Sequence, residues 1–438
     1  MYKTLKSPLN IQVEITEECN NICRHCYNFF RHKTELGNRS IKIEEIEYLV
    51  AEFKKLQVVR LTITGGEPLS TPEKTIYLAK KSKEIGMSVT LNSNLTIFDK
   101  KLGEKLKNSG ISVIMTSLLS HNPNTHDYIT QSCGSWGKTT ENIKLATDMG
   151  FRVLVNMVLT KWNILDLKDT GNFVGYLGVA KFGATRACAP IPIAKEFTNQ
   201  MISLDELRGS LKILYELKEK WGYDVDVFEH YPWCALQDVE KYSYLARRKC
   251  TAGITSASVG YDGELRPCGH SNMRYGNVFK EGLQRPWLRM DDWRETKYSN
   301  TRCNSCPLIK MCTGGCPTEN INSEKGIDHH CTTYKDITTL PKKKILCDIN
   351  PNEEFIFYPN TVLRTEEFGG ILIIASGGQI LLDKEAFDIV SFLFNNREGI
   401  SVNKLVGSFK ATQNESNFLI NRLINEGLIK TNKGGGKT

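Results

Sequence analysis

Three cysteines near the N-terminus constrain the fold most strongly. Cys19, Cys23 and Cys26 are spaced C-x3-C-x2-C, which suits a short loop wrapped around a compact metal cluster. A structural zinc site takes four protein ligands, and a cubane iron–sulfur cluster held by protein alone takes four thiolates. A trio leaves one metal open to a small molecule, so an iron–sulfur cluster with an open iron fits this spacing best.

A glycine pair follows one strand later. Residues 59–64 have the composition of a buried strand, and Gly65, Gly66, Glu67 and Pro68 come directly after it. Glycine lets the backbone approach a ligand closely, and α/β barrels place their chemistry at the carboxyl ends of strands. With both motifs in this order, a structural zinc loop beside an ordinary turn is the less favoured alternative.

These two segments resemble the radical S-adenosylmethionine (SAM) superfamily. The three cysteines match its cluster motif, and the segment from Gly65 to Pro68 matches the one that holds the methionyl amino group. The resemblance implies that an open iron chelates SAM and that one electron cleaves SAM to a 5′-deoxyadenosyl radical. Such a radical can abstract hydrogen from an unactivated C–H bond.

The first half of the chain alternates strand-like and helix-like segments. The expected strands are residues 11–15, 59–64, 88–92, 112–117, 152–158 and 180–186, separated by segments with helical periodicity. Repeated β-α units predict an α/β fold with a parallel sheet. Six such units match the partial (β/α)6 TIM barrel of the superfamily, with the cluster loop and the glycine turn on one rim.

Other rim residues resemble SAM contacts. His25 holds the place of an aromatic residue beside the adenine, although it could simply be solvated. Ser117 ends the fourth strand, where relatives carry Ser-Leu-Asp-Gly and this chain reads Ser-Leu-Leu-Ser. Asn156 fits a polar contact on the fifth strand, with a buried, hydrogen-bonded asparagine as the alternative.

A His-Asp pair, His126 and Asp127, also matches the relatives. The arginine that often follows, and that is thought to meet the SAM carboxylate, is replaced by Thr130. Lys138 and Arg152 are candidate replacements, each with the alternative of an ordinary surface or strand residue.

Seven further cysteines occur between residues 250 and 331. Their order resembles the SPASM domain, which implies two auxiliary 4Fe–4S clusters. A two-zinc module is the alternative, but a four-cysteine zinc ribbon normally shows two C-x2-C pairs. The resemblance assigns four residues to an outer cluster: Cys303, Cys306, Cys312 and Cys331. It assigns three to an inner cluster: Cys250, Cys268 and Cys316.

The inner set is one ligand short. Some relatives supply a further cysteine shortly after the one matching Cys250, but the stretch that follows it here has none. Cys234 is the predicted donor; otherwise the site is open or takes another ligand. Cys133 and Cys188 are expected to be buried, inert thiols, and Cys347 lies outside both patterns.

His270 is the candidate catalytic base. Sulfatase-maturing relatives place an aspartate directly after the cysteine matching Cys268, but here Gly269 and His270 follow. The unperturbed pKa of histidine is near neutrality, which suits a base. An ordinary polar loop histidine is the alternative.

The C-terminal segment predicts a winged helix. Strands are expected at 355–358, 361–365 and 370–375, and helices at 384–395, 402–408 and 415–425. The last helix carries too few cations to neutralise phosphates in a DNA groove. Residues 362–372 resemble a peptide-recognition element related to the pyrroloquinoline quinone peptide chaperone, which captures a leader peptide as an added strand. A domain with only a packing role is the alternative.

The predicted domains are a radical SAM barrel (1–235), a SPASM domain (236–340), a winged-helix peptide-recognition domain (341–430) and a disordered tail (431–438). The N-terminus lacks an apolar signal core, and no window reaches membrane-spanning length. With 14 cysteines and a net charge of +8, the chain is expected to be a cytoplasmic metalloprotein. Neither nucleic acid nor membrane is an expected partner.

Together these features predict a radical SAM/SPASM maturase of a ribosomally made peptide. It would use SAM and three 4Fe–4S clusters to install an oxidative change, such as a C–C or C–S crosslink. The expected partners are a leader-bearing precursor peptide and a reductant such as flavodoxin or ferredoxin. The alternatives are oxidation of a protein Ser or Cys to formylglycine, and a non-catalytic iron–sulfur electron carrier.

Overall fold

The computed structural model divides the chain into two compact units, Met1–Pro341 and Lys342–Thr438. It describes residues 2–28, 39–189, 195–221, 224–242, 248–295, 297–298, 301–323, 326–341, 348–374 and 377–432. Cys347 and the predicted tail beyond residue 432 lie outside the described residues.

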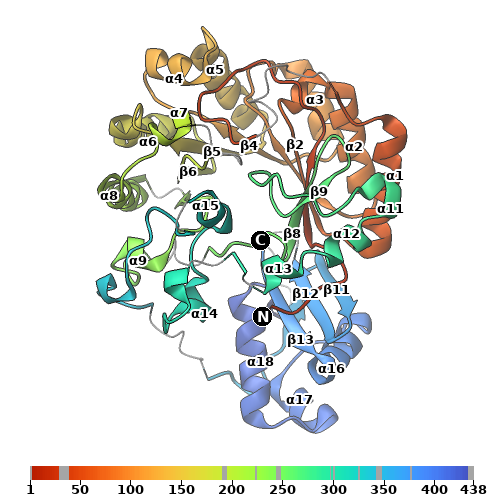
Figure 1. The fold of residues 1–438 in the computed structure, drawn as a ribbon. Helices are drawn as coiled ribbons and strands as arrows, with labels where there is room; N and C mark the ends of the chain where they lie inside the picture. The colour runs from red at the N-terminus through yellow and green to blue at the C-terminus, as the bar shows by residue number, and fades with distance from the viewer. Residues whose placement is uncertain are drawn as a thin grey trace. The chain divides into compact units, whose positions relative to one another are not determined.

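The first unit is built on a nine-stranded sheet in the order β7-β6-β5-β4-β3-β2-β1-β8-β9 (Figure 1). The strands are β1 (Asn10–Glu14), β2 (Arg60–Thr64), β3 (Ser88–Asn92), β4 (Val113–Ser117), β5 (Arg152–Leu159), β6 (Lys181–Arg186), β7 (Asp224–Asp226), β8 (Ser256–Val259) and β9 (Leu265–Arg266). β1 to β8 pair in parallel, and β9 pairs antiparallel with β8. The predicted α/β class and partial barrel are therefore confirmed.

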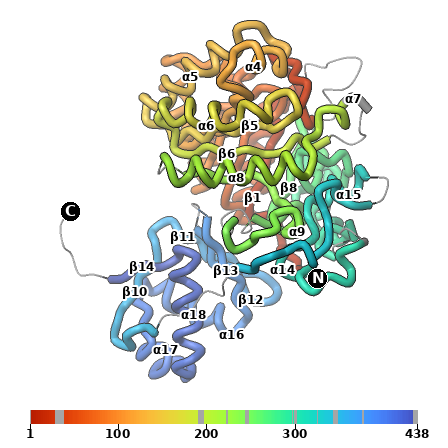
Figure 2. The backbone as a smooth tube through the Cα atoms, turned by 90° about the vertical axis from the view of Figure 1, so that its left-hand side faces the viewer, coloured from red at the N-terminus to blue at the C-terminus, as the bar shows by residue number. Residues whose placement is uncertain are grey.

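The main helices lie on the outside of this curved sheet (Figure 1). They are α1 (Ile43–Leu56), α2 (Pro72–Glu84), α3 (Lys100–Asn108), α4 (Pro123–Thr130), α5 (Ser135–Asp148), α6 (Leu167–Tyr176) and α8 (Leu204–Trp221). α6 and α8 lie side by side (Figure 2), because Gly171 of α6 leaves room for Leu217 of α8.

Alternation along the strands separates an apolar face from a polar one. The apolar face is buried and includes Ile11, Val13, Leu61, Ile63, Val89, Leu91, Ile114, Val153, Val155 and Phe182. The opposite face is half-buried and polar, and includes Gln12, Thr62, Thr90, Ser117, Asn156 and Thr185. Because Phe182 lies next to Gly171 of α6, the apolar face is the one under the helices, and the polar face lines the barrel interior.

Three strands of the sheet were not predicted. β7 has only three residues, two of them aspartates. β8 and β9 come from the segment predicted as the SPASM domain, yet they extend the barrel sheet beyond β1. A buried ion pair between Glu14 of β1 and Arg266 of β9 joins the two regions. The cysteine-rich segment is thus built onto the barrel sheet.

Short helices make up most of the remaining regular structure of this unit. They are η2 (Pro68–Ser70), η3 (Ile164–Asp166), α7 (Lys195–Thr198), α9 (Trp233–Leu236), α11 (Val278–Glu281), α12 (Gln284–Leu288), α13 (Asp291–Arg294), η4 (Thr301–Cys303), α14 (Ile309–Cys312), α15 (Pro317–Asn322) and η5 (Tyr334–Asp336), where η marks a 3₁₀ helix. In the described part of the chain, no helix is both long and apolar enough to cross a bilayer.

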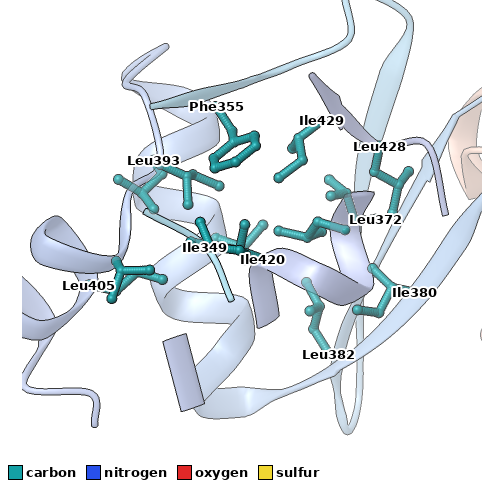
Figure 3. Packing of buried hydrophobic residues seen from close by; sticks show 14 of the residues in the cluster. Ile349, Phe355, Leu372, Ile380, Leu382, Leu393, Leu405, Ile420, Leu428 and Ile429 are labelled. Atoms are coloured by element: carbon teal, nitrogen blue, oxygen red, sulfur yellow. The ribbon is translucent and has the colours of Figure 1, made fainter. Parts of the chain in front are cut away.

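The second unit combines two small sheets with three helices. β10 (Phe355–Phe357) pairs with β14 (Ile429–Thr431), and β11 (Thr361–Glu366), β12 (Gly369–Ile374) and β13 (Gln379–Asp383) form a three-stranded sheet. The helices are α16 (Lys384–Asn395), α17 (Val402–Phe409) and α18 (Gln413–Asn425). Their apolar side chains meet in one core, which includes Leu372, Leu382, Leu393 and Ile420 (Figure 3). The three predicted helices are present, while β13 and β14 were missed.

Candidate active site and cysteine clusters

The three N-terminal cysteines lie in the loop that leaves β1. The loop begins with a hydrogen bond from Ile15 N to Thr64 O (2.8 Å), and Cys26 N donates to Cys23 O (3.1 Å). All three cysteine side chains are half-buried, and none of the described cysteines forms a disulfide. The loop therefore carries three thiols outside any disulfide, which as thiolates are metal ligands.

The glycine turn after β2 packs directly against this loop. Gly66 N donates to Thr16 O (2.7 Å), and Glu67 N donates to Glu18 O (2.6 Å). A Cβ atom at residue 66 would lie 2.0 Å from Glu18 O, and one at Gly65, where φ is +150°, would lie 2.4 Å from Thr16 O. The glycines were predicted to allow close approach to a ligand. The structure adds that they allow close approach to the cysteine loop itself.

The carboxylate of Glu67 is fully engaged within the protein. It is buried and accepts hydrogen bonds from Leu69 N (2.9 Å), Ser93 Oγ (2.7 Å) and Asn94 N (2.7 Å). Burial raises the pKa of Glu67, and these donors oppose the rise. The side chain thus fixes the turn after β3 rather than facing a ligand.

Ser117 and Asn156 are direct neighbours in the β4–β5 register. Both are half-buried on the polar face, and Asn156 Nδ2 donates to Thr185 Oγ1 (3.0 Å). The structure therefore places them together at the rim, although Asn156 already has a partner. Asn92, at the end of β3, was missed; its buried Oδ1 has no hydrogen-bond partner among the described residues.

His25 carries a similar unpaired atom. Its buried Nδ1 has no hydrogen-bond partner in the described part of the chain. Burial, with a smaller contribution from His126, lowers the pKa of His25 to about 4, so the ring is neutral near pH 7. A neutral imidazole with an unused nitrogen fits a polar or aromatic ligand group better than it fits solvent.

The His-Asp pair has structural roles here. His126 Nδ1 accepts a hydrogen bond from Leu119 N (3.2 Å). The Asp127 carboxylate accepts from Gly134 N (2.6 Å) and Trp136 N (2.8 Å) at the start of α5. These two side chains fix the segment that follows β4.

Thr130 does not point to a ligand either. It is buried, and its Oγ1 lies 2.7 Å from Ser135 Oγ. The two candidate replacements for the missing arginine lie where their alternatives place them. Lys138 is exposed on α5, and Arg152 begins β5, at the end of the strand opposite the rim.

The outer cysteines surround a cavity of about 310 Å³ whose lining includes Cys234, Cys303, Cys306, Cys312 and Cys331. Cys234 Sγ lies 3.6 Å from Cys331 Sγ, and Thr332 N donates to Cys234 Sγ (3.3 Å). The prediction that Cys234 serves the inner set is therefore wrong. Hydrogen bonds between α9 and the chain around residue 332 hold it beside the outer set.

The inner cysteines also lie together. Burial raises the pKa of Cys250, and the neighbouring Cys316 and Cys268 raise it further. Burial and Cys316 likewise raise the pKa of Cys268. Cys188, predicted to be inert, has a neighbouring thiol in Cys316, which together with burial raises the pKa of Cys188. Cys133, predicted to be buried, is exposed.

His270 stacks on Tyr27, with ring centroids 4.1 Å apart. Burial lowers its pKa to about 4, so the ring is neutral near pH 7. A Cβ atom at Gly269 would lie 3.0 Å from Gln12 Nε2 and 3.1 Å from Tyr27 Cε2. The structure thus leaves little room for an aspartate at residue 269.

The fold and these donors define a class of protein: an open α/β barrel with a cysteine loop at the carboxyl ends of its strands and further cysteine sites beside it. Three grouped thiols, an unpaired imidazole nitrogen and polar strand ends fit a 4Fe–4S cluster with SAM. Residues 13–174 match the family model described as the radical SAM superfamily. Residues 13–174 therefore form a radical SAM domain, and the chain is an enzyme that carries this domain.

Several known proteins are similar to this chain. The antilisterial bacteriocin subtilosin biosynthesis protein AlbA of Bacillus subtilis is 26% identical over 360 residues, which span 78% of this chain and 73% of AlbA. The AdoMet-dependent heme synthase of Methanosarcina barkeri is 22% identical over 329 residues, 72% of this chain and 93% of that protein.

Solved structures share the fold. Streptococcus suis SuiB bound to precursor peptide SuiA superimposes with a TM-score of 0.62 at 17% identity, covering 77% of each chain. Native anSMEcpe with bound AdoMet gives a TM-score of 0.62 at 16% identity, covering 75% of this chain and 96% of that one.

Proposed function

We propose that this protein is a radical SAM/SPASM maturase that oxidatively modifies a ribosomally synthesised precursor peptide, with a C–C or C–S crosslink as the favoured product. The observation that carries the proposal is one chain holding both the cysteine-bearing barrel and a separate unit with a peptide-sized groove. The likeness to AlbA, a bacteriocin biosynthesis protein, and to the fold of peptide-bound SuiB supports it.

Each part of the rim has an assigned role. Cys19, Cys23 and Cys26 would hold the SAM-binding cluster. When bound, cluster and SAM together supply a 5′-deoxyadenosyl radical that removes hydrogen from the peptide. The Gly65-Gly66 backbone would hold the methionyl group, and the side chains that would orient the rest of SAM are His25, Ser117 and Asn156.

The auxiliary sites would hold two further 4Fe–4S clusters. The outer set, Cys303, Cys306, Cys312 and Cys331, has a cavity of about 310 Å³ between its thiols, and the inner set contains Cys250, Cys268 and Cys316. Such clusters can accept an electron from a substrate radical, which an oxidative crosslink requires. We further propose a cytoplasmic location and a flavodoxin or ferredoxin as reductant.

The second unit supplies a candidate leader site. β13 is an edge strand of its sheet, and a groove of about 280 Å³ runs between β13 and helices α16, α17 and α18. Ile380 and Leu382 are buried in the core (Figure 3), so Leu381 between them is turned out and is 44% exposed. Phe418 of α18 also lines the groove and is 50% exposed. An open strand edge beside an apolar groove suits β-augmentation by a peptide.

A matched pair of variants on α18 tests this site. Phe418→Ser should weaken binding of a fluorescent leader peptide by about ten-fold or more, because it removes an apolar anchor. Ile424→Ser, at a residue 40% exposed but outside the groove lining, should leave the affinity unchanged. Equal affinities, or full affinity after deletion of residues 345–438, would remove the leader site from the proposal.

The activity is tested on a short precursor peptide sought among the reading frames next to the gene for this protein. With SAM and dithionite, mass spectrometry should show loss of hydrogen from the peptide together with 5′-deoxyadenosine. Formylglycine formation is less favoured, because the space at Gly269 is restricted. An electron carrier should produce no 5′-deoxyadenosine at all.

A heme-forming activity is the second candidate, because an AdoMet-dependent heme synthase is among the similar proteins. It would act on a small molecule and have no use for a leader groove. Heme formation by the purified enzyme, with the precursor peptide unchanged, would favour it.

A further inference from the structure

We propose that Cys188 is the fourth ligand of the inner auxiliary cluster, which it completes together with Cys250, Cys268 and Cys316. The inference rests on the proposed function, which assigns a 4Fe–4S cluster to this site. It adds a ligand that comes from the barrel and that follows β6 by two residues.

Contacts between thiols carry the assignment. Cys188 is 8% exposed, and its thiol lies close enough to that of Cys316 for the two to interact. Cys316 in turn lies close enough to Cys250 and Cys268 to act on both electrostatically. These four thiols from three distant parts of the chain therefore lie near one another, and four thiolates are the number that a protein-held cubane needs.

Buried interactions hold both halves of this site in position. Arg186, at the end of β6, forms a two-pronged ion pair with Asp328 (2.7 Å for each contact) and a further one with Glu229 (3.1 Å). Cys188 Sγ donates to the other carboxylate oxygen of Glu229 (3.3 Å). The chain just before Cys188 is thereby fixed against Asp328 of the cysteine-rich segment.

A second link starts from the other cysteine. Cys316 is the residue that precedes α15, and Asn322 at the end of α15 donates from Nδ2 to Ala189 O (2.9 Å). Ala189 follows Cys188 directly. The helix that begins at one thiol thus binds the backbone beside the other.

The other candidate for the fourth ligand, Cys234, lies at the outer site. Cys234 lies 3.6 Å from Cys331 and lines the outer cavity. With four thiolates, each iron of the inner cluster has its protein ligand, so no iron there is open to a substrate thiol. Electrons would then pass between the inner cluster and the substrate without a bond between iron and the substrate.

The test uses the full chain with Cys19, Cys23 and Cys26 replaced by alanine, which removes the cluster with the intentionally open iron. This parent is reconstituted anaerobically, reduced with dithionite and treated with ¹³C-cyanide. Electron–nuclear double resonance then reports whether any remaining iron binds cyanide. The parent should show no ¹³C coupling, because both auxiliary clusters have four thiolates.

Adding Cys188→Ala should either create a ¹³C coupling or lower the iron content by about four per chain. Cys188→Ser should shift the g-values of the reduced inner cluster. The matched control, Cys133→Ala, changes an exposed cysteine outside both sites and should behave as the parent does.

Two outcomes would overturn the assignment alone: cyanide coupling already present in the parent, or a Cys188→Ala protein with the parent's iron content and spectrum. The first outcome is measured on the parent, which has no change at residue 188. It therefore tests the assignment even if the Cys188 variants fail to fold. Zinc in place of iron in the parent would overturn the proposed function together with this assignment.

Discussion

The N-terminal cysteine loop and the inner auxiliary site gather thiols in opposite ways. Cys19, Cys23 and Cys26 lie within one short loop, and the hydrogen bond from Cys26 N to Cys23 O shapes it locally. The inner site instead collects Cys188 from the end of β6 and Cys316 from the start of α15, which are brought together by buried long-range interactions. A site of the first kind is encoded by spacing, whereas a site of the second kind is encoded by the tertiary fold.

The largest expected effect distinguishes the N-terminal cysteine loop from the auxiliary sites. Cys23→Ala removes one of three ligands from a loop that the auxiliary sites do not share, so it should abolish 5′-deoxyadenosine formation while iron at the auxiliary sites remains. Chromatography of the SAM cleavage products and iron analysis of the same preparation measure both. Loss of all iron would show that the sites are interdependent.

Arg186→Met tests whether buried long-range interactions hold the auxiliary cysteine sites together. It leaves the carboxylates of Asp328 and Glu229 buried without their cation, and removing one partner of a buried pair costs about 3–5 kcal/mol of unfolding free energy. The auxiliary iron content should fall, while the cluster loop keeps its own contacts. Denaturant unfolding and iron analysis check this.

Arg289→Met serves as the control for that change, because Arg289 is half exposed in its pair with Glu281. Its unfolding curve should stay close to that of the wild type. If both arginine variants unfold alike, the buried network does not hold the auxiliary sites.

Gly66→Ala tests how far the cysteine loop depends on the turn that follows β2. The new Cβ atom would meet the backbone of Glu18 at 2.0 Å and push the loop away from β2. A displacement of about 1 Å in a catalytic site can lower turnover roughly 100-fold, so SAM cleavage should fall by about that factor. Gly209→Ala in α8, where a Cβ atom meets nothing within 4 Å, should have no effect on cleavage.

The smallest effect concerns pH. Burial lowers the pKa of His126 to about 4 from the ordinary 6.5, so the unfolded chain takes up a proton below pH 6.5 that the folded protein does not bind until near pH 4. Stability should therefore fall as the pH drops through this window, by about 2 kcal/mol at pH 5 from this residue. His126→Gln should reduce the loss of unfolding free energy as the pH falls, as measured by denaturant unfolding. An unchanged pH dependence would contradict the assignment of this loss to His126.

Local patterns predicted much of this structure. The strand at 88–92 was predicted with its observed bounds, because alternation over five residues is a local signal. β7 was missed because three residues carry no such signal. β8 and β9 were missed because they join the barrel by pairing with a strand far away in the sequence.

The candidate site likewise has features with a local sequence signal and features that depend on distant contacts. The cysteine trio and the glycine turn could be recognised from their spacing, and the structure groups them at one rim. Cys188 was taken for an inert thiol because nothing in its own neighbourhood points to a partner as distant in sequence as Cys316. Cys234 was assigned to the wrong set because its position along the chain, just before Cys250, says nothing about the fold of α9 against residue 332.

Iron analysis of the anaerobically reconstituted wild type tests the central claim most directly, when compared with the Cys19→Ala/Cys23→Ala/Cys26→Ala chain. Three 4Fe–4S sites predict about 12 irons and 12 sulfides per wild-type chain and about 8 of each in the variant. Zinc in place of iron and sulfide, or an iron content that the triple replacement leaves unchanged, would contradict the account.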